Sequence, residues 1–341
     1  MTQPLKKHFG KALLAFSFLL LLVLVVSTSM GAENIPFSKV VKIILSEIPI
    51  LGKYYGDYTG PHSTIVTLIR LPRILLGLLT GLALAVSGSS MQGIFKNPMA
   101  SPFILGVSAG GAFGAAVGIY LNISIFILPL LAFIFGMATA FTVFLLGRVG
   151  SRTDISTLLL AGLAMNFLMT ALTSFVLFIS DPMERMGIVS WMWGSLNGTY
   201  WEEVIIALPL TILGVVLVFA YSRDLNVIQT GEESAKQLGI NVERTKIVQL
   251  ITSSLLAATV ISFTGVIGFV GLIIPHASRL LVGPDHKKLI PIAGLLGGVF
   301  LVSCDTISRI SGEIWIGIIT GLVGAPFFIY LLIKNRGEPV W

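Results

Sequence analysis

Three arginines are the side chains best suited to recognising an anionic group. Arg70 and Arg73 flank Pro72 just before a long apolar segment, and Arg309 lies near the end of another. Guanidinium groups form paired hydrogen bonds with carboxylates. The same residues could also anchor helix ends, with apolar stems and charged heads that reach water. Pro72 is itself typical of the first turn of a helix.

A short polar segment, 230–240, predicts a helix with defined ends. Thr230 and Glu233 have the spacing of a capping box. Gly239 is a natural helix stop, and Leu238 and Ile240 place apolar groups beside it. Either ordinary loop structure or a contact for another protein would give this pattern.

Two familiar signatures of catalysis are missing from the sequence. No G-x-x-x-x-G-K-[ST] or HExxH motif occurs, so neither a P-loop nor a zinc-protease helix is indicated. The single Cys304 excludes a Cys-rich metal site and is expected to lie inside a helix as a small apolar residue. His276 alone is a weak ligand candidate. We therefore expect no catalytic residue and no metal ligand.

The elements that carry these residues must lie in lipid. The chain has 341 residues, of which 55% are hydrophobic and 11% charged, and its mean hydropathy is +0.94. A soluble domain carries roughly 25% charged residues. A membrane span needs about 20 apolar residues, and the candidate spans are 12–30, 73–91, 103–121, 125–147, 156–179, 203–221, 247–265, 267–283, 289–307 and 314–334.

These spans predict an all-α integral membrane protein with about ten transmembrane helices in one domain, 1–341. The run 247–283 is divided near Gly265 and Gly268, because one helix of that length would overshoot the bilayer. Segment 12–30 could instead be a signal peptide. With the N-terminus in the cytosol, more of the 22 Lys and Arg residues fall inside than outside. We therefore expect both termini in the cytosol.

Three connections are long enough to carry structure of their own. The outer connection 31–70 contains a stretch, Ser38–Glu47, expected to form an amphipathic helix at the membrane interface. The outer segment 181–202 is rich in aromatic residues, and Glu184–Leu196 is expected to be helical. Segment 223–246 is the longest inner connection.

Small residues recur every four positions in several spans. Gly106, Gly110, Gly114 and Gly118 would form one stripe on a helix, and Gly77, Gly81 and Ala85, like Gly317 and Gly321, would form others. Such stripes let helix backbones approach closely in membranes. We expect a compact bundle.

Four motifs, found in order, carry a family resemblance. They are Arg70–Gly114 (RLPRILLGLLTGLALAVSGSSMQGIFKNPMASPFILGVSAGGAFG), Gly231–Ile240 (GEESAKQLGI), Gly268–Leu280 (GFVGLIIPHASRL) and Glu313–Leu332 (EIWIGIITGLVGAPFFIYLL). The chain resembles, from about residue 12 onward, the FecCD-type permeases of ABC importers for iron–siderophores, haem and vitamin B12. Only the outer connection 31–69 looks longer than usual.

The resemblance implies an architecture and a set of partners. The fold would be that of a type II ABC importer permease, in the cytoplasmic membrane. A second permease copy, as homodimer or close heterodimer, two cytosolic ABC ATPase subunits and an extracytoplasmic substrate-binding protein would complete the complex. The permease would bind no cofactor directly, since ATP and magnesium would sit on the ATPases. No nucleic-acid partner is expected.

The resemblance also implies roles for particular residues. Arg70, Arg73 and Arg309 match positions that receive acidic residues of the binding protein. The segment that includes Thr230, Gly231, Glu232, Glu233, Ala235, Leu238 and Gly239 matches the helices that couple to the ATPase. Asn97, Met99, Ile155 and Ser156 match cytosolic gates, although Met99 and Asp154-Ile155-Ser156 depart from the residues usual there.

The expected function is therefore import of a metal chelate, with iron(III)–siderophore favoured over cobalamin, haem or an oxyanion such as molybdate. A secondary transporter or channel is the alternative, but it would usually carry more buried ionisable groups. An intramembrane enzyme would need a catalytic pair, and a scaffold would leave the outer arginines unexplained.

Overall fold

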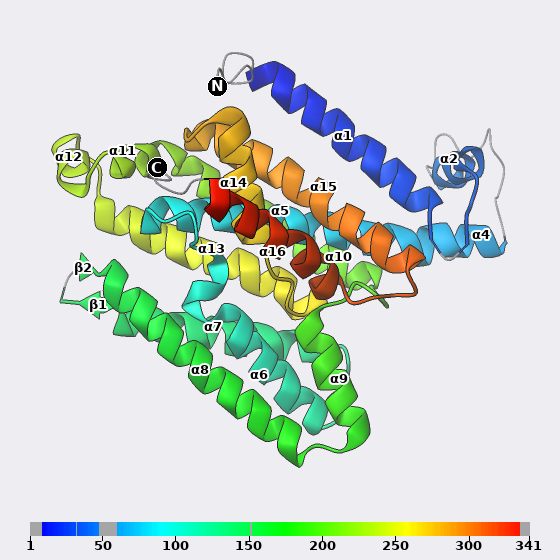
Figure 1. Cartoon of the computed structure of the whole chain (residues 1–341). Helices are drawn as coiled ribbons and strands as arrows, with labels where there is room; N and C mark the ends of the chain where they lie inside the picture. The colour runs from blue at the N-terminus through cyan, green and yellow to red at the C-terminus, as the bar shows by residue number, and fades with distance from the viewer. Residues whose placement is uncertain (1–8, 32, 48–59, 151, 335–341) are drawn as a thin grey trace.

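The computed structural model describes residues 9–31, 33–47, 60–150 and 152–334, and it is almost wholly helical (Figure 1). Four of the Lys and Arg residues used to predict the topology, Lys6, Lys7, Lys53 and Arg336, lie outside these ranges, as does much of the connection 31–70. The elements in chain order are α1 (Phe9–Ser29), α2 (Phe37–Ser46), α4 (Pro61–Thr64), the π-helix η2 (Ile65–Arg70), α5 (Leu71–Phe95), the 3₁₀ helix η3 (Pro102–Leu105), α6 (Val107–Tyr120), α7 (Leu128–Leu146), β1 (Arg148–Val149), β2 (Arg152–Thr153), α8 (Ile155–Ile179), α9 (Pro182–Trp193), α10 (Trp201–Ala220), α11 (Ser222–Gln229), α12 (Glu232–Gln237), α13 (Val242–Thr264), α14 (Val270–Val282), α15 (His286–Ile310) and α16 (Ile316–Lys334).

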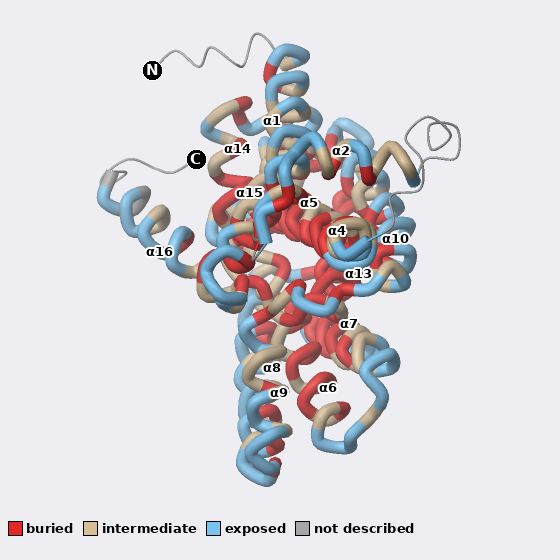
Figure 2. The backbone as a smooth tube through the Cα atoms, turned by 90° about the vertical axis from the view of Figure 1, so that its right-hand side faces the viewer, coloured by how far each residue is buried: buried red, intermediate tan, exposed pale blue. Residues whose placement is uncertain are grey.

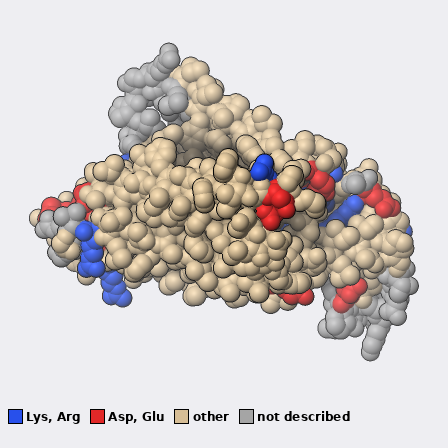
Figure 3. Space-filling view, turned by 90° about the horizontal axis from the view of Figure 1, so that it is seen from below, with Lys and Arg blue, Asp and Glu red and all other residues tan. Residues whose placement is uncertain are grey.

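The described residues confirm the fold class. Seven of their helices are long and apolar enough to cross a membrane, and α6, α14 and α16 are shorter apolar helices. Each of these ten overlaps one of the predicted spans, although several extend beyond it. Charged side chains gather toward the two ends of the face in Figure 3, with a broad uncharged region between them.

The long apolar run after α13 is broken, as predicted. α13 ends at Thr264, Gly265 has φ 69°, and α14 begins at Val270. The irregular backbone finds partners inside the protein: Ser195 N donates to Thr264 O at 2.8 Å, and Val266 N to Trp191 O at 3.3 Å. A break at this position is tolerated because protein, rather than lipid, satisfies its polar groups.

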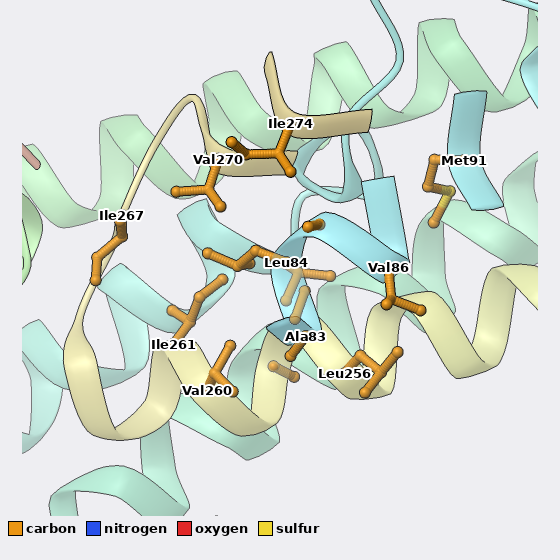
Figure 4. Packing of buried hydrophobic residues seen from close by; sticks show 14 of the residues in the cluster. Ala83, Leu84, Val86, Met91, Leu256, Val260, Ile261, Ile267, Val270 and Ile274 are labelled. Carbon is orange, nitrogen blue, oxygen red and sulfur yellow. The ribbon is translucent and has the colours of Figure 1, made fainter. Parts of the chain in front are cut away.

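Helix α5 is the centre of the bundle (Figures 1 and 2). Nearly all of its residues from Leu79 onward are buried, against α13, α14 and α15. Leu84, Val86 and Met91 pack there with Val260 and Ile274 (Figure 4). By contrast, α8 is largely exposed, and large apolar residues such as Phe178 face outward.

The small-residue stripes do bring backbones together. A Cβ added to Gly81 on α5 would collide with the carbonyl oxygen of Gly297 on α15. On α6, a Cβ at Gly114 would lie 2.7 Å from Leu131 O of α7. Close backbone approach is what small residues permit in membrane bundles, so the predicted compact packing is confirmed.

The prediction that Pro72 begins a helix is wrong. The helix is already formed at Pro61 and passes through η2 into α5 without interruption. Leu71 N donates to Val66 O, a π-helical bond, just before the proline. A proline has no N–H and its ring crowds the preceding turn, and a π-turn is a common way to accommodate such a disturbance.

Two further helices appear where expected, with shifted ends. α2 covers most of Ser38–Glu47, and α9 begins two residues before Glu184 with a capping box formed by Asp181 and Glu184. Cys304 lies buried within α15, 2% exposed.

Candidate functional site

Two of the three predicted docking arginines, Arg73 and Arg309, share one buried carboxylate. Asp305 is fully buried in α15, and its two oxygens accept from Arg73 Nε at 2.8 Å and from Arg309 Nε at 3.1 Å. Arg73 also pairs with Glu313 through two bonds of 3.0 and 2.8 Å. The network joins α5, α15 and the connection to α16, and the pairing offsets the cost of burying these charges.

The end of α1 receives the remaining guanidinium hydrogen bonds. Arg309 donates to Met30 O and Ser27 O, both at 3.0 Å. Arg70 donates to Thr28 O at 2.8 Å, to Ser29 O at 3.1 Å and to Glu33 O. The last carbonyls of a helix lack partners within it, and positive charge is favourable there. The arginines therefore hold α1 against the bundle.

The three arginines thus lie together at one end of the molecule, but they face inward. Arg70 is 4% exposed, Arg73 3% and Arg309 6%. In this conformation their hydrogen bonds go to the chain itself, so docking to another protein stays a prediction. Sequence reasoning missed Asp305 and Glu313 as partners. The four-residue spacing of Asp305 and Arg309 on one helix was an available signal.

The predicted coupling segment forms α11 and α12. The prediction that Thr230 and Glu233 form a capping box is wrong. Thr230 ends α11 and its hydroxyl donates to Val227 O at 2.8 Å, so it cannot cap α12. Gly231, at φ 135°, takes the N-cap position without a side-chain bond. The stop is confirmed: Gly239 has φ 79°, and Ile240 N donates to Ala235 O at 3.0 Å.

One face of this segment is left open. Ala235 is fully buried beneath it, whereas Leu238 is 71% exposed. Glu233 pairs with Lys236 at 2.5 Å on the surface, and Glu232 turns back toward α13. Figure 1 shows α11 and α12 at the same end as the β1–β2 hairpin, opposite α2 and α4.

The two predicted gate positions lie in separate turns. Asn97 Oδ1 accepts from Met99 N at 2.8 Å, which makes a tight turn after α5, and Met99 is 49% exposed. Ile155 and Ser156 begin α8, where Asp154 accepts from Thr157 N at 2.7 Å. Hydrogen bonds from Thr157 hold the pKa of Asp154 below its usual value. The cap therefore stays charged at neutral pH.

The two turns are connected through η3 rather than directly. A Cβ on Gly162 of α8 would collide with the carbonyl oxygen of Ile104 in η3. Asn166 Nδ2 lies 3.4 Å from Phe103 O. The chain after Met99 is therefore packed on α8 near Gly162, which lies about two helical turns after Ile155. The gate role itself stays a prediction.

Ten apolar helices of the described part of the chain form a bundle, with the inward-turned arginine cluster at one end and the exposed α12 segment at the other, an arrangement typical of a polytopic transport protein. The family model described as the FecCD transport family matches residues 19–334. The chain belongs to this family, whose members are permeases of ABC importers.

Individual relatives and a solved structure agree with this. The chain is 41% identical to the cobalamin import system permease protein of Halobacterium salinarum, over 93% of this chain and 94% of that one. It is 38% identical to the hemin transport system permease protein of Yersinia pestis, over 79% and 83%. A metal-chelate type ABC transporter, solved in an inward-facing conformation, superposes with a TM-score of 0.82 at 32% identity, covering 96% of this chain and 99% of that one.

Proposed function

We propose that this permease imports a metal chelate through a complex powered by two cytosolic ATPase subunits. The observation that carries the cargo class is the match over nearly the whole chain to a metal-chelate type ABC transporter. Iron(III)–siderophore stays the cargo predicted from sequence. Cobalamin is the second candidate, favoured by the 41% identity to a permease named for it.

In the proposed cycle, the end of the bundle that carries α11 and α12 binds the ATPases. ATP closes the two ATPases, and their movement displaces α11 and α12, where Leu238 offers an exposed apolar contact. A second permease copy supplies the other wall of the pathway, and the chelate passes along the axis between the copies. Met99, Asn97 and the start of α8 form the inner gates.

A binding protein delivers the chelate at the other end. Carboxylates on its surface meet the region of Arg70, Arg73 and Arg309, and steer the encounter. Since these guanidiniums are engaged internally here, docking would have to compete with their bonds to Asp305, Glu313 and α1. Both termini lie in the cytosol, as the distribution of positive charge favours.

The test compares uptake in cells lacking this permease with cells in which it is restored. Each is offered radiolabelled ferric siderophore and, separately, radiolabelled cobalamin, with and without depletion of ATP. Uptake of one cargo that needs both the permease and ATP supports the proposal and identifies the cargo. Restored uptake that persists without ATP would overturn it in favour of a secondary transporter.

A further inference from the structure

A buried lysine lies between the coupling segment and the start of α8. The side chain of Lys246, on the second turn of α13, is 6% exposed. Its Nζ is 2.7 Å from Glu232 Oε1 at the beginning of α12, and 3.5 Å from Thr153 O at the end of β2. A buried ammonium is costly unless it is paired and hydrogen-bonded. The position of this amine therefore depends on two segments that lie far apart in the sequence.

A second hydrogen bond ties the same face of α13 to the hairpin. Glu243 lies three residues before Lys246, so both side chains project from one side of the helix. The hydroxyl of Thr153 donates to Glu243 Oε1, and Thr153 is 3% exposed. Only Asp154 separates this threonine from Ile155, the first residue of α8.

The space between these elements is a polar cavity rather than packed core. It has a volume of about 580 Å³, and its lining includes Thr153, Ile155, Glu232, Glu243 and Lys246. Because the cavity lies between α12 and the start of α8, apolar packing there does little to join them. The ion pair instead joins α12 to α13, and the hydroxyl bond joins α13 to β2, at the end where Figure 1 shows both α12 and the hairpin.

We infer that Lys246 is a positioning residue that transmits movement of the coupling segment to the gate-bearing helix α8. The inference rests on the proposed function, since it needs α12 to move with the ATPase. When Glu232 shifts, the amine must follow it or lose its counter-charge. Following it pulls on the Thr153 carbonyl, and with it on the backbone that leads into Ile155. Energetic coupling between distant sites is carried by such contiguous networks when they have two arrangements.

The test replaces the charge and keeps the stem. Lys246→Met, Lys246→Arg and wild type are purified in nanodiscs with the partner ATPase, and chelate transported per ATP hydrolysed is measured. We expect Lys246→Met to assemble and hydrolyse ATP, with transport per ATP about tenfold lower, which is within the usual range of coupling between sites. Lys246→Arg should retain most of it. Equal transport per ATP in Lys246→Met and wild type would overturn the inference.

A charge exchange separates positioning from mere stability. Lys246→Glu should abolish transport, and adding Glu232→Lys should restore part of it because the pair is re-formed in reverse. Hydrogen exchange of residues 148–156 gives a readout that does not need transport. We expect faster exchange there in Lys246→Met than in wild type, and unchanged exchange would count against the link. Wild-type transport that does not depend on ATP would instead refute the proposed function, and the exchange comparison could still be made.

Discussion

Arg73 Nε lies 2.8 Å from Asp305 Oδ1, and both side chains are buried. The two residues are 232 positions apart, and the bond joins the central helix α5 to α15 at the end where α1 also finishes. Asp305 is shared with Arg309. One carboxylate is thus shared by two buried guanidiniums, and Glu313 supplies a second carboxylate to Arg73.

Removing that carboxylate should destabilise the end of the bundle where the three arginines lie. Asp305→Asn leaves two buried guanidiniums without their shared anion, and we expect a loss of about 3–5 kcal/mol in unfolding free energy. Thermal unfolding in detergent would show it as a lower midpoint. Glu313→Gln is the matched control, because the Glu313 side chain is 42% exposed and its loss should cost about 1 kcal/mol or less. Equal midpoints for the two variants would contradict the role given to Asp305.

Close helix packing makes a second prediction. Gly81→Val would push a side chain into the carbonyl of Gly297 on α15. Overpacking against backbone cannot be relieved by a rotamer change, so we expect a loss of about 3 kcal/mol or more, seen as reduced folded yield. Gly10→Val on α1 meets nothing within 4 Å and should leave the yield unchanged. A folded yield for Gly81→Val equal to that of Gly10→Val would show that the bundle is looser than described.

Docking at the outer end can be tested through Arg70. We expect Arg70→Ala to weaken association with the binding protein about tenfold and to flatten the salt dependence of association, since charge complementarity sets it. Titration at two salt concentrations measures both effects. Arg185→Ala is the control, because Arg185 donates to Ser180 O on a different outer segment and has no predicted docking role. Wild-type affinity and salt dependence for Arg70→Ala would leave the arginine as an anchor of α1 alone.

A substitution at the exposed residue Leu238 should weaken association with the ATPase without unfolding the permease. Leu238 is 71% exposed, so Leu238→Asp should change thermal stability little. We expect it to weaken binding of the ATPase by about 2 kcal/mol, the cost of removing an apolar interface anchor. Gln237→Asp, one residue earlier and also exposed, should bind almost as wild type does. If both variants bind equally, Leu238 is not the anchor.

The fold could be predicted where local rules dominate. Apolar length located the ten helices, and the glycines at 265 and 268 located the break between α13 and α14. The start of the second span was misjudged because Pro72 was taken as a helix start. Tertiary packing and a π-turn carry the helix past it instead. The predicted capping box at Thr230 does not form because Thr230 is instead the C-terminal cap of the adjacent helix α11.

The candidate site was less accessible to sequence reasoning. The clustering of Arg70, Arg73 and Arg309 followed from topology, but their inward orientation depends on Asp305, Glu313 and the carbonyls ending α1. The local sequence around Arg73 does not indicate that it contacts Asp305 and Glu313, more than 200 residues away. Lys246 received no predicted role of its own, because its partner Glu232 lies in the neighbouring helix α12.

The burial of Cys304 has a practical consequence. Thiolate is the form that reacts with maleimides, and a thiol 2% exposed inside α15 is shielded from them. Since Cys304 is the single cysteine in the sequence, we expect the native chain to react little with thiol reagents, and it needs no prior removal of cysteines before labelling. Single cysteines introduced at either end of the bundle can be probed with a membrane-impermeant reagent, which would map directly which end faces the cell exterior.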